Sequence, residues 1–169
     1  MALPDYCDTP DELEKNPNAK QFFVMVANGD KAAYDFLWRF WCFAHCYDDL
    51  LDGGKEVGMD MGVREFVNFF TMISFNPFYQ RHKEQLFSLI IQVCTRSLDG
   101  DEWERSDDKI KRIVSHVVRC GDIDLYMHVA YLTGGWDHMR KLKFIRRYDS
   151  NGVEQEELGL TNSQNTEIA

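Results

Sequence analysis

The sequence has no long apolar run and no start typical of a secreted protein. No stretch of about 18 consecutive apolar residues occurs, which is the length that a membrane-spanning helix needs. The opening residues, MALPDYCDTPDELEK, contain neither the basic region nor the apolar region of a secretion signal. These two absences predict a soluble, cytoplasmic protein with no transmembrane segment.

Positive charge and paired cysteines are also scarce. The chain has 19 Lys and Arg against 28 Asp and Glu, a net charge of -9, which argues against general nucleic-acid binding because phosphate contacts need a positive surface. The five cysteines are odd in number and lack paired C-x-x-C spacing. Small buried thiols are therefore expected rather than zinc ligands or a disulfide framework. Neither G-x-x-x-x-G-K-[ST] nor a Ser-His-Asp arrangement is present.

Aromatic residues and helical periodicity are plentiful. The 169 residues are 44% hydrophobic and 14% aromatic, enough for one packed domain. Apolar spacing predicts helices over residues 34–52, 63–74, 79–98, 106–132 and 136–148, and a helix or a strand over 20–27. Asp30 is the expected N-cap of the central helix, Ser106 is the expected cap of a later one, and a capping box at residues 9–12 predicts a first short helix. We expect an all-α, compact single-domain bundle of about six helices over residues 1–148, followed by a polar tail at 149–169.

The central stretch YDFLWRFWCFAHCYDDLLD, residues 34–52, combines a strongly apolar helix with acids. At about 100° per residue, its polar side chains fall in one wedge, with two tryptophans one to two turns below them. The members of this wedge are His45, Asp48, Asp49 and Asp52, with Trp38 and Trp41. Neighbouring carboxylates repel, so the pattern indicates raised pKa values or a bound cation, and all-oxygen ligands favour Mg²⁺. The alternative is the solvated end of a helix, since Gly53 and Gly54 follow directly.

Three further features qualify as candidate binding groups. Asp124 and His128 are i, i+4 neighbours on an apolar helix, which fits either a site or a hydrogen bond that satisfies a core histidine. Lys55, in the glycine-rich segment 53–62, could reach the acids or a phosphate, unless that segment is a plain connector. A basic cluster within WDHMRKLKFIRRY, residues 136–148, could contact an acidic partner or be a solvated face.

Residues 43–52, FAHCYDDLLD, resemble the first aspartate-rich motif, F-C-R-x-x-D-D-x-x-D, of the squalene/phytoene synthase branch of the isoprenoid synthases. Residues 124–134, DLYMHVAYLTG, are similar to that family's Y-C-x-x-V-A-G-x-V-G helix at Val129, Ala130 and Gly134. The chain has His45 where the family has Arg, and it has no second aspartate motif. The resemblance implies a reduced relative with a terpenoid-synthase-like helical fold.

The same resemblance implies roles for the acids and the tryptophans. Asp48, Asp49 and Asp52 would hold the Mg²⁺ that grips a prenyl diphosphate, and an apolar pocket, to which Trp38 and Trp41 are suited, would hold the prenyl tail. The expected function is therefore Mg²⁺-dependent binding, with or without turnover, of a diphosphate-bearing small molecule.

Two other functions are open. One is a non-catalytic helical interaction protein with no metal site, which would contact a partner through the basic cluster and exposed aromatics. The other is a helical metal-dependent phosphohydrolase that uses the aspartates with His45, Asp124 and His128. Dependence on a metal would separate both enzyme-like functions from the interaction protein.

Overall fold

The computed structural model describes Cys7 and residues 18–52 and 58–148, and every regular element in this part of the chain is an α-helix. The helices are α2 (Ala19–Ala27), α3 (Lys31–Asp52), α4 (Met59–Phe75), α5 (Pro77–Glu104), α6 (Lys109–Arg119) and α7 (Gly121–Tyr148). The predicted all-α fold is confirmed. The helix predicted from residue 9, residues 53–57 with Lys55, and the tail at 149–169 lie outside the described residues.

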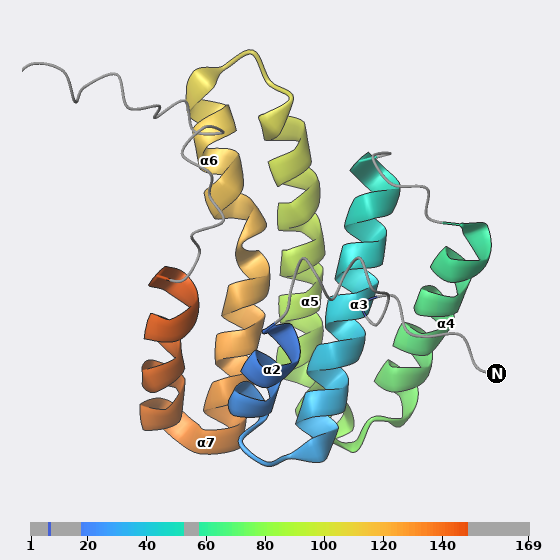
Figure 1. Cartoon of the computed structure of the whole chain (residues 1–169), viewed down its shortest axis with the longest axis vertical. Coiled ribbons are helices and arrows are strands. Elements are labelled where there is room, and N and C mark those ends of the chain that lie inside the picture. The colour runs from blue at the N-terminus through green and yellow to red at the C-terminus, as the bar shows by residue number, and fades with distance from the viewer. Residues whose placement is uncertain (1–6, 8–17, 53–57, 149–169) are drawn as a thin grey trace, which may run out of the picture.

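The longer helices lie side by side along the long axis of the molecule (Figure 1). Helices α3 and α5 occupy the middle, α4 forms one outer edge beside α3, and the second half of α7 forms the opposite edge. The short helix α2 packs against both α3 and α7. Among the helices that the structure describes, α4 packs against α3 and α5.

Helix α3 is the centre of the core. Its start is fixed as predicted by Asp30, whose Oδ1 accepts hydrogen bonds from the backbone N–H groups of Ala32 and Ala33 at 2.9 and 3.1 Å. Its apolar residues cover nearly the whole circumference, so the helix is buried between α2, α4 and α5. Phe36 and Phe40, for example, are almost fully buried and contact aromatic rings of α4 and α5.

The fold reverses direction inside α7. The predicted stop at Gly134–Gly135 is confirmed as a break at Gly135, whose φ of 75° lies in the left-handed region that glycine adopts readily. The residues after it run back alongside the first half of the helix (Figure 1). The basic cluster is thus carried to the edge of the molecule opposite α4.

Three local predictions were wrong. Helix α5 continues past its predicted end at residue 98 to Glu104, and α4 begins at Met59, inside the glycine-rich segment 53–62. Asp108, not Ser106, caps α6: its Oδ1 accepts from the N–H groups of Ile110 and Lys111, while Ser106 Oγ accepts from Asp108 N–H. A search of the described residues finds no helix long and apolar enough to cross a membrane.

Candidate functional site

The two tryptophans of the predicted site belong to the core. Trp38 and Trp41 are both buried. The ring of Phe23 on α2 meets them edge-on, with centroid distances of 6.3 and 5.5 Å, and Trp41 also contacts Tyr126 of α7. These contacts join α2, α3 and α7, so the two rings act in packing.

His45 is held against the same core. Its Nδ1 lies 3.2 Å from the carbonyl oxygen of Trp41, one turn earlier, and the centroids of the two rings are 3.7 Å apart. The side chain is half-buried. His45 therefore lies on the tryptophan side of α3.

Asp48 and Asp49, at the end of α3, influence the pKa values of different residues. Asp48 is exposed and its charge acts on Arg119 of α6, whereas Asp49 is half-buried and acts on Cys46. This divergence follows from their adjacency, because successive helical residues point about 100° apart. Asp52 is the last residue of α3, and its side chain lies outside the described part of the structure.

The sequence analysis missed an ionic group between α3 and α4. Glu65 of α4 is buried and pairs with Arg64 at 3.5 Å. Burial, with the charges of Glu65 and Asp49, raises the pKa of the Cys46 thiol to about 11. The thiol is therefore protonated near neutral pH and a poor nucleophile. Nothing in the local pattern singled out Glu65, because a glutamate inside a helix is ordinarily solvated.

A second missed group joins α5 to α6. Arg119 donates a hydrogen bond to the buried carboxylate of Asp101 and pairs with Glu104 at 2.6 Å. Burial acts to lower the pKa of Arg119, but the charges of Asp101, Glu104 and Asp48 outweigh it and raise that pKa. The guanidinium thus supplies the positive charge at the centre of three carboxylates from two other helices.

Asp124 and His128 are turned to different partners. Asp124 pairs with Arg96 of α5 at 2.9 Å, and His128 Nε2 lies 2.9 Å from Oε1 of Gln85. Burial, followed by the charge of His82, lowers the pKa of His128. Both residues thus tie α7 to α5.

No group of three or more His, Cys, Asp or Glu side chains suited to a metal ion occurs among the described residues. That finding does not include the side chain of Asp52, which lies outside the described part of the structure, as does Lys55. The Mg²⁺ site at Asp48, Asp49 and Asp52 therefore stays a prediction.

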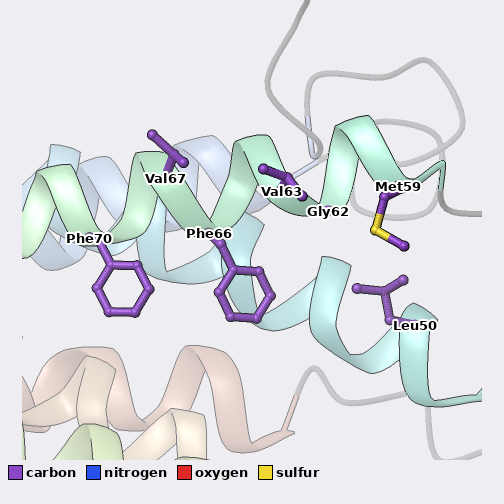
Figure 2. Close-up of a pocket in the computed structure, with 7 residues that line it drawn as sticks. All are labelled: Leu50, Met59, Gly62, Val63, Phe66, Val67 and Phe70. Atoms are coloured by element: carbon purple, nitrogen blue, oxygen red, sulfur yellow. The ribbon is translucent and has the colours of Figure 1, made fainter.

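The sequence analysis also missed an apolar groove of about 390 Å³ between α4 and the end of α3. Figure 2 shows Phe66 and Phe70 projecting from α4 in the same direction, with Leu50 of α3 beside Met59. The groove is lined by Leu50, Met59, Gly62, Val63, Phe66, Val67 and Phe70. No charged side chain is among these lining residues.

The groove exists because α4 buries a different face from the one its pattern indicates. Helical spacing in the sequence groups Val63, Phe66, Val67, Phe70 and Ile73 on one apolar face. The first four are exposed, and Ile73 alone of the five packs against the core. The buried positions of α4 are instead Gly62, Glu65, Phe69 and Met72. A helix with apolar residues around most of its circumference does not specify which stripe faces the core.

The same inversion occurs on α6. Of the five apolar residues that helical spacing groups on one face, Ile110, Ile113 and Val117 are exposed and Val114 and Val118 are half-buried, while Ser115 is the buried residue. Ser115 and Arg119 face α5, where Gly100 leaves room for the Arg119 side chain. The side of α6 that faces α5 thus carries the ionic contact of Arg119 with Asp101.

The chain matches no protein-family model, no curated protein and no solved structure.

Proposed function

We propose that this protein is a non-catalytic helical interaction protein, and that the groove beside α4 receives the apolar face of a helix from another polypeptide. The observation that carries the proposal is the groove itself, which is lined by apolar side chains of α4, an edge helix among the described elements, and by Leu50 of α3. Helix-in-groove recognition uses apolar anchors at i, i+3, i+4 and i+7 that enter such a surface.

The exposed apolar area supports this function energetically. Met59 is 79% exposed, Val67 57% and Phe70 60%. Full burial of such side chains is worth about 1.5–3 kcal/mol each, so covering the exposed part contributes roughly 1 kcal/mol for each. Large apolar patches are uncommon on proteins that have no partner, and they typically mark interaction sites.

The polar groups proposed for chemistry have structural partners. His128 and Asp124 tie α7 to α5, and His45 is held against the carbonyl oxygen of Trp41. This arrangement favours the interaction protein over the phosphohydrolase, because the candidate acid–base groups are divided among separate contacts. The Mg²⁺–diphosphate function is the remaining alternative, and it depends on the acids at the end of α3.

Fluorescence anisotropy with a labelled synthetic peptide tests the proposal. The probe is an amphipathic helix of about 18 residues with leucine at i, i+3, i+4 and i+7 and uncharged polar residues elsewhere. We expect saturable binding to the native chain and loss of binding in Phe70→Glu. The matched control is Ile110→Glu, which replaces an exposed apolar residue of α6, outside the groove, and should bind normally. Equal binding by the two variants, or no binding by the native chain, would overturn the proposal.

A further inference from the structure

Helix α6 presents a row of apolar side chains to solvent. Ile110, Ile113 and Val117 are exposed, Ile110 by 72%. Their intervals of three and four residues place them on one side of the helix. Ser115, which is buried, and Arg119 mark the side that faces α5. At about 100° per residue, the apolar row lies roughly opposite these two positions, so α5 leaves it uncovered.

Exposed lysines border the apolar row. Lys109 and Lys111 flank Ile110 in the sequence, so they lie about 100° to either side of it around the helix, and both are exposed. Because a lysine has an apolar stem and a charged tip, a lysine at the edge of an apolar face keeps its charge in water beside a nonpolar surface. An apolar face bordered by lysines is typical of a helix that lies in the plane of a lipid interface.

Helix α6 is basic although the chain as a whole is acidic. Residues 109–119 contain four Lys and Arg and no Asp or Glu, whereas the chain has a net charge of -9. Arg119 is paired with carboxylates of α5, so the other three, all exposed, carry the accessible positive charge of the helix. Two acids, Asp107 and Asp108, precede the helix, and the Asp108 carboxylate caps it. Along the helix itself the accessible charge is positive.

A second basic segment lies on the same flank of the molecule. Helix α6 packs on α5, and Figure 1 shows the second half of α7 below α6, on the side of the molecule away from α5. Residues 136–148 contain five Lys and Arg and one Asp. Trp136 is 63% exposed, and the Cζ atom of Arg140 lies 5.8 Å from the centroid of a Trp136 ring. Exposed tryptophan is typical of protein surfaces at the level of lipid headgroups.

We infer that this flank, the apolar row of α6 together with the second half of α7, docks on an anionic lipid bilayer. The apolar row enters the boundary between headgroups and acyl chains, and the Lys and Arg side chains meet the anionic headgroups. A bilayer suits the row better than an acidic polypeptide does, because a fluid surface conforms to a protruding helix, whereas a polypeptide partner needs a groove of its own to receive one. The inference is independent of the groove beside α4.

Vesicle co-sedimentation measures this binding. The probes are vesicles of phosphatidylcholine alone and vesicles that also contain about 30% phosphatidylserine. We expect the native chain to bind the phosphatidylserine vesicles much more tightly, and this binding to weaken between roughly 50 and 500 mM salt because salt screens the charges. Lys109→Gln/Lys111→Gln should lower the partition coefficient roughly 25-fold, since each positive charge near an anionic surface contributes about fivefold.

The variant Ile110→Glu tests the apolar row. It should lower the partition coefficient about tenfold or more while the circular dichroism spectrum stays native. The matched control is Phe70→Glu, which adds the same charge to α4 and should bind vesicles as the native chain does. Equal loss in the two variants, or binding that Ile110→Glu leaves intact, would overturn the inference, as would a native chain that binds neither kind of vesicle.

An environment-sensitive fluorophore locates the contact. In a Cys120→Ser background, which removes the exposed thiol, a nitrobenzoxadiazole group is attached at Ile110→Cys or, as the control, at Val67→Cys of α4. Phosphatidylserine vesicles should shift its emission to shorter wavelength at position 110 and leave it unchanged at position 67. No shift at position 110, or equal shifts at both positions, would contradict the arrangement.

The proposed function and the lipid contact fail in different ways. A chain that binds the leucine-containing peptide through Phe70 but binds no vesicles refutes the lipid contact and retains the interaction function. A chain that binds vesicles through Ile110 but does not bind the peptide does the reverse. Binding of polyglutamate that Ile110→Glu abolishes, without vesicle binding, would assign the flank to an acidic polypeptide and overturn the inference.

Discussion

The ionic contact between α5 and α6 gives a quantitative prediction for Arg119→Met. Asp101 is only 5% exposed, and its Oδ2 has no hydrogen-bond partner among the described residues, so Arg119 is its principal compensation. Removing one member of a buried ion pair typically costs 3–5 kcal/mol, because the other charge is left buried. The Arg119 side chain is 28% exposed, so we expect the lower end, about 3 kcal/mol of unfolding free energy.

Urea unfolding followed by circular dichroism measures this cost. The double variant Arg119→Met/Asp101→Leu should recover most of the loss, because no uncompensated charge remains. The control is Arg81→Met, which breaks a pair with Asp30 whose arginine is 59% exposed and should cost less than about 1 kcal/mol. If Arg119→Met costs no more than Arg81→Met, or the double variant is less stable than the single one, the role assigned to this contact is wrong.

Three further predictions concern titration, thiol reactivity and metal binding. The pKa of His128 in the folded chain lies below its ordinary value of about 6.5, so the fold is most stable above that pH and loses stability as the pH falls below it. Urea unfolding at about pH 7.5 and pH 5.5 should therefore show a smaller difference in stability for His128→Gln than for the native chain. Ellman's reagent should react rapidly with the exposed Cys120, whereas Cys46, with its pKa raised to about 11, should react only on unfolding. In isothermal titration with Mg²⁺ and pyrophosphate, an interaction protein shows no saturable binding, whereas binding that Asp48→Asn abolishes would restore the diphosphate hypothesis.

Much of the fold could be predicted from the sequence because its signals are local. The cap at Asp30 and the break at Gly135 depend on a few neighbouring residues, and both are confirmed. The end of α5 could not be read in this way. Asp99, Gly100 and Asp101 give a typical turn signal, but Asp101 is held in the helix by Arg119, 18 positions along the chain. A partner that distant leaves no periodic signal.

The candidate site was harder to predict than the fold. The acids of α3 stand out in the sequence, whereas the groove arises from which side of α4 faces the core, a choice made by tertiary packing. Phe69 stacks on Phe43 of α3 with a centroid distance of 4.2 Å, and this contact turns Val67 and Phe70 outward. The sequence shows how apolar α4 is, but its neighbours decide which residues remain uncovered.

An NMR titration tests the central claim most directly, because it reports where on the molecule binding occurs. Backbone amide spectra of the labelled chain would be recorded with increasing amounts of the leucine-containing synthetic peptide, and separately with Mg²⁺ and pyrophosphate. We predict that the peptide shifts the amides of residues 59–70 and Leu50, and that Mg²⁺ and pyrophosphate shift none in a saturable manner. Saturable shifts at Asp48 and Asp49 with Mg²⁺ and pyrophosphate, and an α4 that does not respond to the peptide, would contradict the account.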